Sequence, residues 1–154
     1  MNNEEELKRA KRTALQMLTF RTRSKQEIRD KLTQKGISAS IVETVLAHLT
    51  DYGYLDDQAF GQQLALSLFE TKGWGFARIG VTLRARGLSP ELVKKTISQL
   101  KENYSEEKTA LRIMKRRFSH FDFHEAPPKE KQRITQFFRR RGFSWETISR
   151  VLMI

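Results

Sequence analysis

The fold of this chain is decided by an eight-residue pattern that occurs three times: Lys31-Leu-Thr-Gln-Lys-Gly-Ile-Ser38, Thr82-Leu-Arg-Ala-Arg-Gly-Leu-Ser89 and Phe137-Phe-Arg-Arg-Arg-Gly-Phe-Ser144. In each copy, a large apolar residue is followed by two spacers, a base, glycine, another apolar residue and serine. An isoleucine stands eight residues before each glycine, at Ile28, Ile79 and Ile134. A repeat at this interval indicates tandem structural units.

Each copy of the pattern predicts a joint between two helices. Glycine adopts the left-handed conformation that ends many helices without the steric penalty of a Cβ atom. The serine two residues later can cap the next helix by accepting from its unpaired N–H groups. Pro90 directly follows the second of these serines, and proline is favoured at the first position of a helix. The pattern therefore predicts helix, tight turn, helix.

The residues around the joints complete the prediction of the fold. Apolar residues recur at helical spacing on both sides of every joint, and no stretch alternates as a strand does. We therefore predict an all-α protein of about nine helices, arranged as three tandem three-helix units at residues 1–55, 56–104 and 105–154. The glycines are 51 and then 55 residues apart, which predicts a longer loop between Ser119 and Pro128. Small units must pack against their neighbours, so we expect an elongated, curved body.

Charge and composition restrict the possible functions. The chain has 29 basic and 18 acidic residues, a net charge of +11, which favours a polyanionic partner. It has no cysteine, so disulfides, thiolate catalysis and sulfur-ligated metals are excluded. The acidic beginning of the chain does not resemble a secretory signal, and no apolar stretch is long enough for a membrane span. We expect a cytoplasmic protein without membrane contact.

No set of residues predicts an active site. Asp51, Asp56 and Asp57 could hold a metal, but capping of the next helix by Asp56 or Asp57 explains these acids better. His120 and His124 lie in a phenylalanine-rich loop and form a weak metal-ligand pattern. No convincing nucleophile and base occur together. We therefore predict a protein that is not an enzyme and uses no cofactor or metal.

The candidate binding residues come from clusters of lysine and arginine residues. The three predicted units carry net charges of +3, +2 and +6. The last unit includes two runs of three consecutive basic residues. One cation before each glycine is explained by the helix dipole, but three in a row are not. Two interpretations are open for Trp74: it stacks on a nucleic-acid base or a partner side chain, or it packs in the core. The candidate partner- or nucleic-acid-binding residues are Arg23, Lys25, Lys72, Trp74, Arg78, Arg84, Arg86, Lys115, Arg116, Arg117, Arg139, Arg140 and Arg141.

Further motifs resemble the RecX family of recombination regulators. They are Arg23-Ser-Lys-Gln-Glu-Ile-Arg-Asp-Lys-Leu32 with Lys35-Gly36, and Tyr52-Gly-Tyr-Leu-Asp-Asp-Gln-Ala-Phe60, followed by bases and glycines in the second unit. The Gly-Tyr-Leu-Asp-Asp run at 53–57 is the most specific of these. The resemblance extends from about residue 10 to residue 152 and is strongest in the first two units.

The resemblance implies a regulator of the RecA recombinase. Such proteins lie in the helical groove of the RecA–DNA filament and usually inhibit filament growth, ATP hydrolysis, strand exchange and co-protease activity. A monomer with weak electrostatic contact to single- or double-stranded DNA, acting in recombination, repair and the SOS response, would fit this role. The alternative is a free-standing basic DNA-binding protein, because the glycine joints also resemble a helix-turn-helix.

Overall fold

Helices make up all the regular secondary structure of residues 2–154, the part of the chain that this computed structural model describes. The prediction of an all-α protein with about nine helices is confirmed. The nine helices are α1 (Asn3–Phe20), α2 (Lys25–Gln34), α3 (Ala39–Asp51), α4 (Asp57–Glu70), α5 (Phe76–Ala85), α6 (Pro90–Asn103), α7 (Glu106–Arg117), α8 (Pro128–Arg140) and α9 (Trp145–Leu152).

The repeated pattern forms the joints α2–α3, α5–α6 and α8–α9. Gly36, Gly87 and Gly142 have φ angles of 85°, 96° and 91°, so all three glycines adopt the predicted left-handed conformation. Ser89 and Ser144 cap the following helices through their side chains. The prediction for Ser38 is wrong in one respect: it precedes α3, but its side chain makes no capping hydrogen bond. Its N–H instead donates to Glu6 of α1 (2.7 Å).

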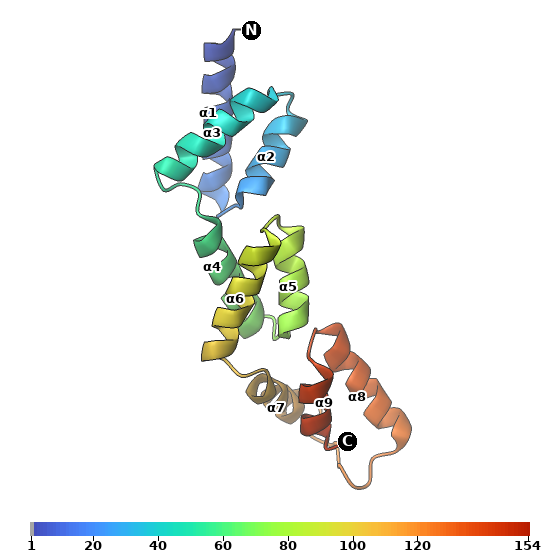
Figure 1. Cartoon of the computed structure of the whole chain (residues 1–154). Helices are drawn as coiled ribbons and strands as arrows, with labels where there is room; N and C mark the ends of the chain where they lie inside the picture. Colours follow the sequence, from blue (N-terminus) through green and yellow to red (C-terminus); the bar gives the residue numbers. More distant parts are fainter. Residues whose placement is uncertain (1) are drawn as a thin grey trace.

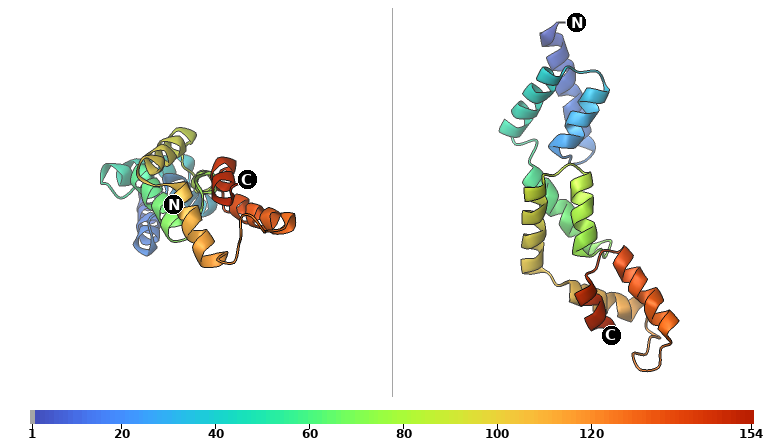
Figure 2. Two further views of the ribbon diagram at one scale, coloured as in Figure 1. Left: turned by 90° about the horizontal axis from the view of Figure 1, so that it is seen from below. Right: turned by 45° about the vertical axis from the view of Figure 1, so that its right-hand side comes forward.

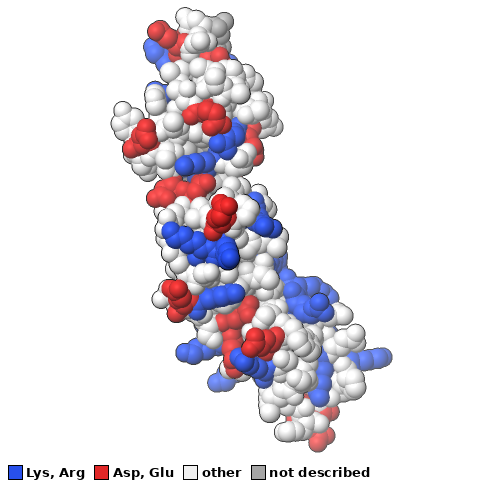
Figure 3. Space-filling view, in the orientation of Figure 1, with Lys and Arg blue, Asp and Glu red and all other residues white. Residues whose placement is uncertain are grey.

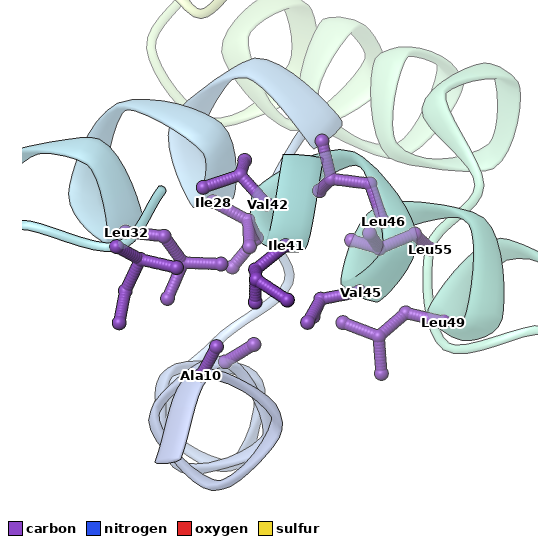
Figure 4. Close-up of a cluster of buried hydrophobic side chains, with 11 residues drawn as sticks. Ala10, Ile28, Leu32, Ile41, Val42, Val45, Leu46, Leu49 and Leu55 are labelled. Atoms are coloured by element: carbon purple, nitrogen blue, oxygen red, sulfur yellow. The ribbon is translucent and has the colours of Figure 1, made fainter. Parts of the chain in front are cut away.

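Three hydrophobic cores follow one another along the chain, and each is formed by three consecutive helices. The first contains α1–α3 and includes Ile28, Leu32 and Val45, which are fully buried (Figure 4). The second contains α4–α6 and the third α7–α9. We call these helix triplets units 1, 2 and 3. The unit boundaries at residues 55/56 and 104/105 stay a prediction.

The units form a row in which the two ends of the chain lie at opposite ends of the molecule (Figure 1). The view turned about the vertical axis shows the same elongated shape, with unit 3 turned away from the direction of units 1 and 2 (Figure 2, right). The expected elongated body is therefore confirmed. Surfaces at the two junctions of this row hold the units together.

The loop between α7 and α8 is longer than its counterparts. It comprises residues 118–127, whereas α1 and α2 are joined by residues 21–24 and α4 and α5 by residues 71–75. Pro128 begins α8, as its fixed φ angle favours. The predicted place of the additional residues is confirmed.

Candidate partner-binding surface

The junction of units 1 and 2 is formed by the first turn of α2 and the joint of unit 2. The Ser24 hydroxyl donates to the carbonyl of Arg86, and the Lys25 N–H donates to Asp57 Oδ1 (2.8 Å). Arg86 Nε also pairs with Glu27 Oε2 (3.2 Å). Asp57 at the start of α4 and the Arg86 carbonyl at the end of α5 thus accept hydrogen bonds from the preceding unit.

Charged groups at this junction shift the pKa of Glu27. Burial raises the pKa of this carboxyl group, but the Ser24 N–H, the Arg21 guanidinium and the charge of Arg86 together outweigh burial. The pKa therefore lies below its ordinary value of 4.5. The lowered pKa favours the ionised form of Glu27, which pairs with both Arg86 and Arg21.

The junction of units 2 and 3 repeats this arrangement with the first turn of α5. The N–H of Gly75 donates to Arg141 O (2.6 Å), and the N–H of Ala77 donates to Gly142 O (3.2 Å). The Phe76 N–H donates to Glu106 Oε1 (3.0 Å). Glu106 stands at the start of α7 as Asp57 stands at the start of α4, so both junctions use an acid at the first helical position.

The joint glycines allow the two units at each junction to approach closely. A Cβ atom at Gly87 would overlap the side chain of Gln26, and one at Gly142 would overlap the backbone of Arg78. These positions therefore require glycine for two reasons, the left-handed backbone and the contact with the preceding unit. The sequence pattern indicates only the first reason.

The junction of units 2 and 3 also gathers five candidate cations, which we call the junction cation cluster: Lys72, Arg78, Arg117, Arg140 and Arg141. The Arg141 side chain donates to the Lys72 carbonyl (3.1 Å), and the Arg78 side chain donates to the Arg140 carbonyl (3.3 Å). Basic side chains gather where the middle of the molecule meets its last unit, on the right-hand edge in Figure 3. Residues from two loops and from the helices α5, α7 and α8 thus form one positive surface.

Aromatic rings support two parts of the junction cation cluster. The guanidinium groups of Arg117 and Arg141 lie 4.6 and 4.5 Å from the ring centre of Phe137. Arg78 lies 3.7 Å from the ring centre of Trp74. Cation–π contacts of this kind hold a guanidinium in place without neutralising its charge. Trp74 is half-buried against the core of unit 2, and its stacking on a nucleic-acid base or partner side chain stays a prediction.

The charges within the junction cation cluster are not balanced by acids. None of the ion pairs formed by residues 2–154 includes a member of this cluster. Burial lowers the pKa of Arg141, and the neighbouring charges of Arg117 and Arg78 lower it further. Mutual repulsion of this kind is relieved when an anion binds, so the cluster favours an anionic partner.

The other candidate residues are distributed over the rest of the molecule. Lys115 and Arg116 are exposed near the end of α7, Arg139 near the end of α8, and Arg84 near the end of α5. Arg23 and Lys25 are half-buried at the junction of units 1 and 2. Arg86 is ion-paired at this junction, which gives it a structural role there.

The carboxylates and histidines considered for a metal have other surroundings. Asp56 caps α4 by accepting from the N–H of Ala59 (3.1 Å). Asp122 accepts from the backbone of the loop that contains His124. Within residues 2–154, no three histidine or acidic side chains converge in a way that could hold a metal ion. No helix in this range is long and apolar enough to cross a membrane.

Sequence reasoning missed the acids that join the units. Asp57 was considered only as a cap of its own helix or a metal ligand, and Glu106 was not considered at all. A signal was present, because Asp56-Asp57 and Ser105-Glu106 each combine a capping residue with an acid at the first helical position. The same pair at the start of two units marks the residue that contacts the preceding unit.

Comparisons with known proteins agree with this architecture. Models of the RecX family match the chain three times: the first three-helix domain at residues 10–49, the second at 56–97 and the third at 105–152. A regulatory protein RecX from Pelodictyon phaeoclathratiforme is 32% identical over 142 residues, which cover 92% of this chain and 85% of that protein. One from Syntrophotalea carbinolica is 28% identical over 132 residues, 86% of each chain.

A solved structure has the same fold. The crystal structure of RecX from Lactobacillus salivarius matches with a TM-score of 0.84 and 17% identity, covering 97% of this chain and 96% of that one. Both relatives are named as regulatory proteins, in agreement with the resemblance found in the sequence. The three domain matches and the identity to a relative of similar length lead to one conclusion: the chain belongs to the RecX family.

Proposed function

We propose that this protein regulates the RecA recombinase by binding along the RecA–DNA filament and inhibiting it. Membership of the RecX family in all three units is the observation that carries this proposal. Bound protein would restrain ATP hydrolysis, strand exchange and co-protease activity. It would do so by contact alone, because neither the sequence motifs nor the surface described above suggests a reaction.

The shape of the molecule supports binding to a long partner. At both junctions, a backbone N–H from the first turn of a helix donates to an acid of the following unit, and a second donor of that turn reaches a carbonyl at the joint, so neighbouring units have a defined orientation. A row of units fixed in this way presents an extended surface, as other repeat proteins do. Contacts distributed over such a surface can bridge neighbouring subunits of a filament.

The junction cation cluster supports a contact with anionic groups of the filament. Its five cations form no ion pair with an acidic side chain among residues 2–154. Positive surfaces of this kind accelerate association with negatively charged partners and align them. We assign Arg139, Lys115 and Arg116 to the periphery of the same contact.

Titration of the protein into RecA, ATP and single-stranded DNA tests the proposal. We expect the rate of ATP hydrolysis to fall at amounts of protein below one per RecA subunit, because one bound molecule affects a filament of many subunits. Unchanged ATP hydrolysis and unchanged strand exchange over the whole titration would refute the proposed function.

A double variant tests the positive surface. Arg139→Ala with Arg140→Ala removes two exposed charges whose side chains make no hydrogen bond or ion pair within residues 2–154. We expect the concentration for half-maximal inhibition to rise roughly fivefold or more, because the electrostatic attraction decreases. Arg141 is left unchanged, since its side chain holds the junction to Lys72.

The matched control for this variant is Lys94→Ala with Lys95→Ala. These exposed lysines of α6 lie outside the cluster, and their loss changes the net charge equally. We expect this control to inhibit almost as the unmodified protein does. Equal loss of inhibition in both double variants would show that only the net charge matters. Tight, sequence-selective binding to bare duplex DNA would favour the helix-turn-helix alternative.

A further inference from the structure

The surface that joins the units is present three times within residues 2–154, and two of these copies contact another unit there. In each used copy, the joint of one unit receives the first turn of a helix from the preceding unit. The joint glycine allows the approach, its neighbouring carbonyl accepts a hydrogen bond, and an acid near the start of the unit accepts another. Unit 1 has no preceding unit within residues 2–154, so its copy of this surface is open.

Unit 1 has a counterpart of each part of the surface, and its acid, Glu6, is the fourth residue of α1 rather than the first. Gly36 has the left-handed φ angle of 85°, as in the used joints, yet no atom of residues 2–154 lies within 4 Å of the position of a Cβ there. The neighbouring Lys35 carbonyl accepts from Arg9 Nη2 (3.1 Å). Arg9 is exposed, so this flexible side chain can move aside for another donor.

The corresponding acid of unit 1 is Glu6, and only one of its two carboxylate oxygens accepts a hydrogen bond within residues 2–154. In unit 3, Glu106 Oε2 accepts from its own unit, from Ser144 and Thr147, while Oε1 accepts from the preceding unit at Phe76. In unit 1, Glu6 Oε1 likewise accepts from the N–H of Ser38 (2.7 Å). The second oxygen has no partner within residues 2–154, and it corresponds to the oxygen that binds the preceding unit in unit 3.

We propose that the open surface of Glu6, Lys35 and Gly36 binds the first turn of an α-helix of the recombinase. This inference rests on the proposed function, because the recombinase is the partner named there. The bound helix has an unpaired N–H at its first position, which donates to Glu6, as Lys25 and Phe76 donate to Asp57 and Glu106. Its backbone packs against Gly36, and its N-terminal donors replace Arg9 at the Lys35 carbonyl.

A second copy of this chain does not supply such a helix from the corresponding place. The equivalent of α2 and α5 in unit 3 is α8, which starts with Pro127 at its cap and Pro128 at its first position. Proline has no backbone N–H, so neither residue can donate to Glu6. Within residues 2–154, unit 3 therefore offers no such donor, whereas the acceptors of unit 1 receive none from another unit.

Gly36→Asn is the first test variant, and Gly53→Asn is its control. Both glycines have positive φ angles (85° and 79°), and both have open space around the Cβ position. Asparagine tolerates the left-handed conformation, so both variants should fold and show similarly small decreases in Tm. Only the side chain at position 36 projects into the proposed interface. We expect Gly36→Asn to weaken binding to RecA filaments on single-stranded DNA roughly tenfold, and Gly53→Asn to leave it within about twofold.

Glu6→Gln is the second test variant, with Glu5→Gln as its control. The glutamine oxygen can still accept from Ser38, which turns the amide NH₂ group toward the partner helix. An N–H of that helix then faces a donor, and binding should weaken by a similar factor. Glu5 is exposed and its side chain makes no hydrogen bond within residues 2–154, so Glu5→Gln should bind as the unmodified protein does.

Filament binding measured by interferometry, together with light scattering of the free protein, separates the outcomes. Selective loss in Gly36→Asn and Glu6→Gln supports the inference. Normal binding by both, or equal loss in test and control variants, overturns it and leaves the proposed function intact. Failure of the unmodified protein to bind filaments overturns the proposed function and this inference together. If light scattering shows self-association and Gly36→Asn abolishes it, a second copy of the chain occupies the surface. That outcome also overturns the inference.

Discussion

At the scale of single residues, the three joint glycines share a backbone conformation but differ in their neighbours. Their φ angles lie between 85° and 96°. Gly36 has open space around its Cβ position, whereas Gly142 lies against the backbone of Arg78. One sequence pattern therefore serves two purposes, the turn in every unit and the contact between units in two of them.

Substitution by alanine separates these two purposes. Gly36→Ala should lower the free energy of unfolding by about 1–2 kcal/mol, the expense of a left-handed conformation for a residue with a Cβ atom. Gly142→Ala should lower it by roughly 3 kcal/mol or more, because the added methyl group overlaps backbone that cannot rotate away. Urea denaturation followed by circular dichroism measures both values. Equal losses would mean that the contact at Gly142 relaxes without penalty.

At the scale of helices, each junction depends on an acid at the first position of a helix. Glu106 is buried and accepts from Phe76 of α5 as well as Ser144 and Thr147 of α9. One carboxylate thus satisfies the starts of two helices that belong to different units. Its negative charge also interacts favourably with the positive ends of both helix dipoles.

Glu106→Ala should therefore weaken both unit 3 and its junction with unit 2. The change leaves a backbone N–H and two hydroxyl groups without their acceptor, and we expect a loss of about 2–4 kcal/mol in the free energy of unfolding. Glu107→Ala is the control: Glu107 makes only a surface ion pair with Arg150 (3.7 Å) and should contribute less than about 1 kcal/mol. Thermal and urea unfolding compare the two variants. A loss for Glu106→Ala no larger than for its neighbour would contradict this role.

The helices and their joints could be predicted from the sequence because their signals are local. The Ile-to-Gly spacing, the serine caps and Pro90 all act within a few residues, and the long loop before Pro128 follows from the uneven glycine spacing. Contacts between units depend on three-dimensional geometry, so sequence spacing did not reveal them. Arg86 and Arg141 have the same place in the pattern, but Arg86 faces Glu27 and Arg141 faces other cations.

At the scale of the whole molecule, the hydrophobic cores are separate and the junctions between them are largely polar. No buried apolar residue is shared between the three clusters described within residues 2–154. Hydrogen bonds to acids and carbonyls, with close contact at glycine, carry each junction. The stability of such a protein is approximately the sum of the stabilities of its units and of their nearest-neighbour contacts.

Local damage should therefore remain largely local, which Ile28→Ala can test. Ile28 is fully buried in unit 1, and its truncation should destabilise that unit by about 2–5 kcal/mol. Native-state hydrogen exchange should then show much weaker protection in α1–α3, a smaller change in α4–α6, and unchanged protection in α7–α9. The graded change follows because unit 2 loses one neighbour, whereas unit 3 keeps its only one. An equal loss of protection in all nine helices would show instead that the polar junctions couple the three cores into one cooperative unit.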